Sequence, residues 1–318
     1  MRGSPVHVRK MIGSIPWVKP AYYVWVRASI VAKQRFGTAR RALSGRMPDM
    51  EYDVTSMPRW GHGSPPHEGL YRVIDQGRRS YAEWLRAAAS AEGLRRIAMN
   101  APAGVEPRWN QGWFPAIDAA ALYVITGALK PATFLEVGSG ESTKFCRRAI
   151  RDYGLTTRIV SVDPQPRAEV DVLCDEVIRR PVETLDPAEF DSLDAGDVLF
   201  IDSSHRVFMN SDVTMLWLDV LPRLKPGVVV HVHDVFLPYD YPLDWSRRFY
   251  SEQYLLAASL LADPSAFELI MATAFVTNDA ELPALLAPLW RDVPLPPEAR
   301  RGWSFWFRVG ADATGPQG

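Results

Sequence analysis

The sequence predicts an α/β fold in which a mostly parallel β-sheet has helices on both faces. Apolar runs and helical patterns alternate from about residue 132 onward, which is typical of parallel strands joined by crossover helices. A glycine turn at 138–140 joins the first apolar run to a helical pattern. The run at 227–233 is continuous and rich in β-branched residues, as expected for a central strand buried on both faces.

The strands expected from these runs are 132–137, 158–162, 176–180, 197–202, 227–233, 267–271 and 302–308. Helical patterns at 209–221 and 251–261 lie between them. The stretch 303–307 alternates loosely, which is typical of an antiparallel last strand. Before the sheet, helical spacing at 71–99 and 117–129 predicts a helical lead-in.

Composition limits the classes of function. The chain has 318 residues, of which 47% are apolar, and this is enough for a large core. The net charge of −1 gives no indication of nucleic-acid binding. The two cysteines, Cys146 and Cys174, cannot form a disulfide framework, which favours a reducing, cytoplasmic setting.

The N-terminal part differs in charge from the rest of the chain. Residues 1–60 contain 11 Lys or Arg and 3 Asp or Glu, so residues 61–318, with 25 basic and 34 acidic side chains, have a net charge of −9. The segment 20–32 is mostly apolar but too short to span a bilayer. Residues 1–45 could therefore lie on the anionic inner face of a membrane, or dock as a helix on the domain or on a second subunit of a homo-oligomer. Both interpretations stay open.

The glycine turn at 138–140 and a later acid indicate an adenosine-containing ligand. Glycines let a ligand approach the backbone, and the following helix offers free N–H groups at its N-terminus. Asp163 ends the second strand, 25 residues after Gly138, a spacing that lets its carboxylate reach ribose hydroxyls. Thr143 stands where a dinucleotide fingerprint has its third glycine, and Glu136 also departs from that pattern. An NAD-linked oxidoreductase therefore stays as an alternative only.

Two sets of motifs carry a family resemblance. The stretch Glu136-Val-Gly-Ser-Gly140 resembles the first motif of class I S-adenosylmethionine (SAM) methyltransferases, and Asp163 resembles their ribose-binding acid. Asp202-Ser-Ser-His205 and residues 233–242 resemble motifs after the fourth and fifth strands of one bacterial group, the O-methyltransferases of small molecules and sugars. The resemblance covers roughly residues 105–275 and implies a seven-stranded, Rossmann-like sheet with one late reversed strand.

The resemblance also implies which residues would bind SAM. Asp163 would accept hydrogen bonds from the ribose hydroxyls, while Glu136 and Ser142 would lie near the methionine end. The full set of expected cofactor-binding residues is Glu136, Gly138, Ser139, Gly140, Ser142, Asp163 and Asp202.

On the acceptor side, His205, His233 and Asp234 are the expected catalytic residues. Either histidine could act as a general base, since imidazole titrates near neutral pH. As an alternative, Asp202 and Asp234 together with one imidazole could bind Mg²⁺. His231 lies in the middle of a strand and is expected to be a hydrogen-bonded core residue.

The leading prediction is a SAM-dependent methyltransferase that methylates a hydroxyl of a small molecule or sugar. The aromatic and acidic loop at 236–245 could stack on a ring and bind hydroxyls. A non-catalytic scaffold that retains the fold is a further interpretation. The expected domains are a basic extension and linker (1–60), a helical lead-in or cap (61–130) and the SAM-binding methyltransferase domain (131–318).

Overall fold

The computed structural model describes residues 55–100, 104–166 and 169–310. The described residues from Ser56 to Gly310 belong to one compact unit. The expectations for residues 1–54, a basic extension with a docked or membrane-bound helix, lie outside the described residues. The predicted domain boundaries stay predictions.

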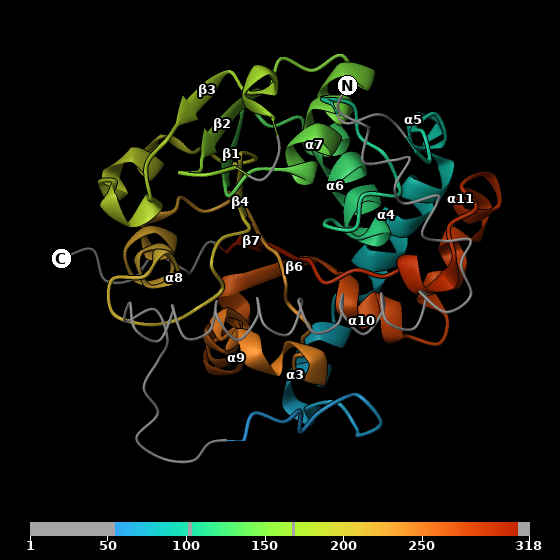
Figure 1. Cartoon of the computed structure of the whole chain (residues 1–318). Coiled ribbons are helices and arrows are strands. Elements are labelled where there is room, and N and C mark those ends of the chain that lie inside the picture. Colours follow the sequence, from blue (N-terminus) through green and yellow to red (C-terminus); the bar gives the residue numbers. More distant parts are fainter. Residues whose placement is uncertain (1–54, 101–103, 167–168, 311–318) are drawn as a thin grey trace, which may run out of the picture. The chain divides into compact units, whose positions relative to one another are not determined.

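A seven-stranded sheet runs through this unit in the order β3-β2-β1-β4-β5-β7-β6 (Figure 1). Its strands are β1 Thr133–Val137, β2 Arg158–Val162, β3 Glu176–Ile178, β4 Val198–Ile201, β5 Val229–Val232, β6 Phe267–Ala272 and β7 Phe305–Val309. Strands β1 to β5 pair in parallel, and β7 runs antiparallel to both β5 and β6. The predicted Rossmann-like, mostly parallel sheet with one late reversed strand is confirmed.

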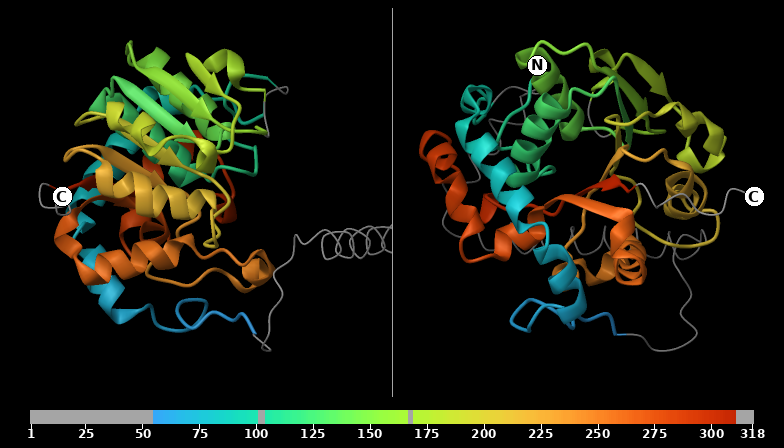
Figure 2. Two further views of the ribbon diagram at one scale, coloured as in Figure 1. Left: turned by 90° about the vertical axis from the view of Figure 1, so that its left-hand side faces the viewer. Right: turned by 180° about the vertical axis from the view of Figure 1, so that it is seen from behind.

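The central strands are apolar along their whole length because helices cover both faces of the sheet. Every residue of β4 and β5 is buried. Helices α4 (Arg78–Ser90), α6 (Ala116–Leu129) and α7 (Glu141–Asp152) lie on one face, and α8 (Asp212–Met215) lies on the other (Figures 1 and 2). The other α-helices of the described residues are α3 Glu68–Asp75, α5 Glu92–Arg95, α9 Glu252–Ala262, α10 Thr273–Asn278 and α11 Ala287–Asp292.

Two predicted helices differ from the structure in detail. The expected helix 71–99 is divided into α3, α4 and α5, with Gly77 at the first division. The expected helix 209–221 begins only at Asp212, widens to a π-helical turn at Leu216–Val220 and ends in a 3₁₀ turn that contains Pro222. Proline has no N–H to continue the helical hydrogen bonds, so the helix ends there.

Helix α6, predicted at 117–129, lies between α4 and α7 and is buried on nearly every side. Its residues from Ala116 to Gly127 are all buried. Asp118 is the only charged side chain in this helix and is 0% exposed. A buried carboxylate is costly unless it is hydrogen-bonded, so Asp118 must find partners inside the protein.

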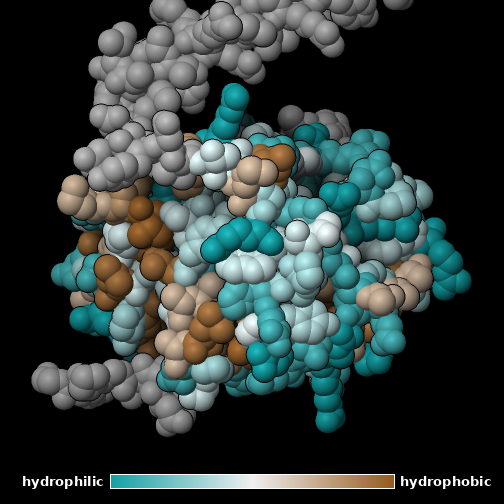
Figure 3. All heavy atoms as spheres, turned by 90° about the horizontal axis from the view of Figure 1, so that it is seen from below, coloured by the Kyte–Doolittle hydropathy of each residue, from teal (hydrophilic) through white to brown (hydrophobic). Residues whose placement is uncertain are grey.

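Figure 3 shows the face that carries α3 and α9, where hydrophilic side chains predominate and hydrophobic ones gather toward one side. Among the described residues, none of the helices has both the length and the apolar character needed to cross a membrane.

Candidate active site

The predicted site residues meet at one edge of the sheet, beyond the carboxyl ends of the parallel strands. The glycine turn follows β1, Asp163 follows β2, and Asp202 follows β4. His233 and Asp234 follow β5. This is the edge at which open α/β sheets bind their ligands.

Gly138 is required by a close approach of two strand tips. Its φ is 86°, and an added Cβ would overlap the backbone carbonyl oxygen of Asp202. Its N–H donates to the carbonyl of Val162 at the tip of β2, 3.0 Å away. An added Cβ at Gly140 would meet no atom within 4 Å, and Gly140 lines a cavity. The turn therefore brings backbone close to open space, as predicted.

Asp163 joins the glycine turn to the second strand. One of its carboxylate oxygens accepts hydrogen bonds from the backbone N–H of Ser139 at 2.8 Å and from the Ser139 hydroxyl at 3.1 Å. The other accepts from the N–H of Gln165 at 2.8 Å. The carboxylate is half-buried, and the second oxygen accepts only this one bond from the described residues, so it has a lone pair left for a ligand hydroxyl.

Glu136 does not reach the cavity; it supports the turn from beneath. Its carboxyl group is 0% exposed, and both of its oxygens contact the hydroxyl of Thr143, at 2.8 and 3.0 Å. The same hydroxyl accepts the N–H of Gly140 at 3.0 Å. Burial raises the pKa of Glu136 to about 8, so the group is largely neutral at pH 7. Thr143 stands where a dinucleotide fingerprint has its third glycine, and here its hydroxyl links the strand to the turn.

A buried ion pair stands at the start of α7, next to the turn. Lys144 Nζ lies 2.9 Å from Glu141 Oε1, and both residues line the same cavity as Gly140 and the buried Ser142. The second carboxylate oxygen of Glu141, Oε2, is buried without a hydrogen-bond partner among the described residues. The pair offers one positive and one unsatisfied negative group to a ligand.

His205 is held between carboxylates on the acceptor side. Its Nδ1 lies 2.9 Å from Glu252, and its Nε2 lies 3.2 Å from Asp202 and 3.4 Å from Asp234. Glu252 is fixed in turn by the indole N–H of Trp217 at 3.0 Å. Burial alone would lower the pKa of His205, but the hydrogen bonds to Asp202 and Glu252 outweigh it and raise the pKa well above its usual value.

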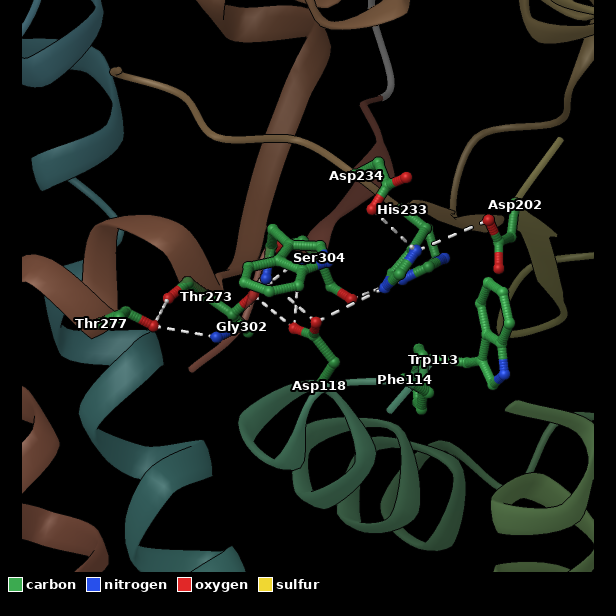
Figure 4. Close-up of polar contacts among 12 residues, drawn as sticks. Trp113, Phe114, Asp118, Asp202, His233, Asp234, Thr273, Thr277, Gly302 and Ser304 are labelled. Atoms are coloured by element: carbon green, nitrogen blue, oxygen red, sulfur yellow. Dashed lines mark hydrogen bonds and ion pairs between the residues drawn. The ribbon is translucent and has the colours of Figure 1, made fainter. Parts of the chain in front are cut away.

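His233 stands between Asp118 on one side and Asp202 and Asp234 on the other (Figure 4). Its Nε2 lies 3.5 Å from Asp118, and its Nδ1 lies 3.5 Å from Asp202 and 3.4 Å from Asp234. Burial would lower its pKa, but the negative charges of Asp202 and Asp234 raise the pKa well above its usual value. Both site histidines are therefore cations near neutral pH.

The two carboxyl groups between the histidines differ in pKa. Burial would raise the pKa of Asp202, but the charge of His233 and the hydrogen bond to His205 hold it well below its usual value. For Asp234, burial prevails over the nearby histidines and raises the pKa. Asp234 also has a φ of 54°, a conformation that non-glycine residues adopt rarely and mostly at constrained sites. Asp234 is therefore the stronger base of the two.

Two residues of this cluster were not assigned to the site from the sequence. Asp118 accepts hydrogen bonds from Thr273, from Ser304 N–H at 3.1 Å and from Trp303 N–H at 3.0 Å, besides facing His233. Glu252, nearly fully buried, is the second partner of His205. A signal for Asp118 did exist, because it is a lone acid in an otherwise apolar helix.

His231 is a core residue, as predicted. It is fully buried, its Nε2 lies 2.8 Å from the Ser304 hydroxyl, and its ring stacks on Phe200 with centroids 3.7 Å apart. Burial lowers the pKa of His231 well below its usual value, so the ring is neutral.

The structure does not support the predicted Mg²⁺ site. Within residues 55–100, 104–166 and 169–310, no three His, Cys, Asp or Glu side chains are placed to hold a metal ion. Carboxylate oxygens of Asp202 and Asp234 already contact ring nitrogens of His205 and His233 at 3.2–3.5 Å. A divalent cation would have to displace these rings, so the residues do not fit the group.

Two cavities open at this edge of the sheet and share part of their walls. The smaller, of about 410 Å³, is lined by Gly138 and Asp163. The larger, of about 1090 Å³, is lined by Gly140 and Asp234 and by both site histidines. Ser139 and Asp202 line both cavities. Of the predicted cofactor residues, Gly138 and Asp163 thus line only the smaller cavity, while Gly140 and Ser142 line the larger one together with the predicted catalytic residues.

Comparison with known proteins agrees with this arrangement. Residues 135–235 match the family model described as a methyltransferase domain. This segment is similar to methyltransferases. It runs from β1 to the residue after Asp234 and so includes every predicted site residue. No curated protein matches the chain.

Several solved structures resemble the chain at low identity. The O-methyltransferase TomG from Streptomyces achromogenes, involved in tomaymycin synthesis and solved with SAM, is 16% identical over 77% of this chain and 91% of that chain, with a TM-score of 0.36. The O-methyltransferase from Bacillus cereus in complex with SAH is 16% identical over 76% and 99%, with a TM-score of 0.34. At such scores these structures say nothing about substrate or residue roles, and the fold rests on the strand order itself.

Proposed function

We propose that the protein is a SAM-dependent methyltransferase that methylates a hydroxyl group of a small molecule or sugar. One observation carries this proposal. The cavity lined by Gly138 and Asp163 adjoins the cavity lined by Asp234, and the two share Ser139 and Asp202. A ligand in the first cavity could therefore present a group to a ligand in the second. The two free cysteines support a reducing, cytoplasmic setting.

The residues of the cofactor side fit SAM. Asp163 would bind the ribose hydroxyls, and the backbone at Gly140 would lie along the ligand. The pair formed by Lys144 and Glu141 would bind the carboxylate and the ammonium of the methionine moiety, with Glu141 Oε2 gaining the partner that it lacks. When bound, SAM supplies a methyl group that its positively charged sulfur activates for displacement.

On the acceptor side, Asp234 would serve as the general base in place of the histidines. Because His205 and His233 are protonated, neither has a free lone pair to take a proton. Asp234 would take the hydroxyl proton as the new C–O bond forms, while the C–S bond breaks and its electron pair stays on sulfur. The two cationic rings would fix Asp202 and Asp234 in position for this step.

Thermal unfolding tests the cofactor directly. SAM and S-adenosylhomocysteine should raise the melting temperature, because a ligand that binds only the folded state stabilises it by about 2.7 kcal/mol at 100 times its Kd. NAD⁺ should have no such effect. A chelator should leave the SAM-dependent shift and the turnover unchanged. The proposal fails if SAM at millimolar concentration produces no shift.

A further inference from the structure

An exposed arginine, Arg248, lies in the wall of the larger cavity. Arg248 lines this cavity together with Trp245, Tyr250 and Trp303. Its guanidinium lies 3.6 Å from the centroid of the Trp245 indole and 5.5 Å from that of Tyr250. The close contact with the Trp245 ring, with Tyr250 as a second and more distant cation–π partner, holds the guanidinium in place.

The hydrogen-bond donors of Arg248 remain available to a ligand. In the part of the chain that the structure describes, its guanidinium has no carboxylate or carbonyl partner; only its backbone oxygen is engaged, by Arg206 at 2.8 Å. Asp234 lines the same cavity, and the positive charge of Arg248 slightly opposes the rise of its pKa, but the two groups are not within ion-pair distance. A guanidinium that stacks on a ring and has free N–H groups along its edges is suited to bidentate binding of a carboxylate or a phosphate.

We infer that the acceptor carries an anionic group, a carboxylate or a phosphate, that binds Arg248. The inference rests on the proposed function and adds the chemical class of the acceptor. Asp234 and Arg248 both line the larger cavity, where Asp234 is buried and Arg248 is exposed. An acceptor with a hydroxyl and an anionic group would place the hydroxyl at Asp234 and the anionic group at Arg248. The rings of Trp245 and Trp303, 5.9 Å apart and edge to face, would contact the part between.

Calorimetric titration with matched probes tests this inference. The probes are 3-hydroxybenzoate, 3-hydroxyphenyl phosphate and the neutral 3-hydroxybenzamide, each added to the full chain with S-adenosylhomocysteine. At least one anionic probe should bind about tenfold tighter than the amide, and the stronger of the two identifies the anion. R248Q should abolish the difference, and R248K should keep part of it because the charge remains. R247Q is the matched control, since Arg247 is exposed and does not line the cavity.

Three outcomes would overturn the inference: equal affinity for the anionic and neutral probes, no saturable binding of either anion at millimolar concentration, or an unchanged preference in R248Q. The melting temperature of each variant checks that it is folded. The proposed function is judged separately by the SAM-induced shift. A protein that binds SAM but shows no preference for anions loses only this inference.

Discussion

On the cofactor side, around the glycine turn after β1, backbone approaches the ligand beside a few charged side chains, Asp163 and the pair of Lys144 and Glu141. The buried acid beneath the turn, Glu136, is mostly neutral. On the acceptor side, beyond β4 and β5, six titratable side chains are packed together, and two of the six are cationic histidines. The cofactor side therefore depends on the conformation of the glycine turn and a few charged groups next to it, whereas the acceptor side depends on a cluster of interacting charges. Substitutions on the first should change affinity for SAM, and substitutions on the second should change turnover.

The largest expected effect is that of Asp234→Asn. The amide cannot accept the hydroxyl proton, so turnover should fall by about 10²–10⁴. Affinity for SAM should stay within a few-fold, because Asp234 is not among the groups proposed to bind SAM, which are Asp163, the Gly140 backbone and the pair of Lys144 and Glu141. Single-turnover methyl transfer and calorimetry measure the two quantities, with the exposed Asp244→Asn as control. Equal losses in affinity and turnover would break the distinction between the two sides.

Glu136→Gln should change how stability depends on pH. In the folded protein Glu136 loses its proton at a pH of about 8, whereas in the unfolded chain it does so near 4.5. Between these values the unfolded state binds fewer protons, so the free energy of unfolding contributed by this group falls as pH rises and is lost above about 8. The loss is at most about 5 kcal/mol, at about 1.4 kcal/mol per pKa unit.

The glutamine variant cannot ionise, so it should be more stable than the wild type at pH 9 and close to it at pH 5. Urea unfolding across this range measures the difference between the two proteins, in which the contributions of His205 and His233 cancel. Glu298→Gln is the control, because Glu298 is exposed. A constant difference at all pH values would mean that Glu136 is ionised in the folded state.

Asp118→Asn tests the link between the acceptor side and the fold. The amide would place its NH₂ donor against one of the two backbone N–H groups that Asp118 accepts, and His233 would lose one of its three acidic neighbours, so the free energy of unfolding should fall by about 3 kcal/mol. Turnover in the folded fraction should fall as well, with a shifted pH profile. Asp219→Asn, at an exposed position, should stay within about 0.5 kcal/mol. A stable variant with normal turnover would show that Asp118 contributes nothing to the cluster.

The two sides also differ in how far they can be predicted from the sequence. The glycine turn and Asp163 are local features, since strand, turn and helix follow one another and the next strand lies alongside, so spacing alone locates them. The acceptor cluster depends on residues far apart in the chain, such as Asp118 and Glu252, which only the folded sheet brings together. The protonation of the histidines could not be predicted either, because it results from how many carboxylates surround each ring.

The smallest expected effect is that of substitutions at Asp163, which separate its role in positioning the glycine turn from the effect of its charge on SAM. Asp163→Ala removes both the acceptor for the ribose hydroxyls and the hydrogen bond to Ser139 N–H, so SAM affinity should fall about tenfold or more. Asp163→Asn can still accept from Ser139 and should keep the turn, so its loss of affinity reports the charge alone. Glu183→Ala, in the wall of the same cavity, is the matched control. If Asp163→Asn binds SAM as the wild type does while Asp163→Ala does not, the carboxylate acts by positioning the glycine turn rather than by its charge.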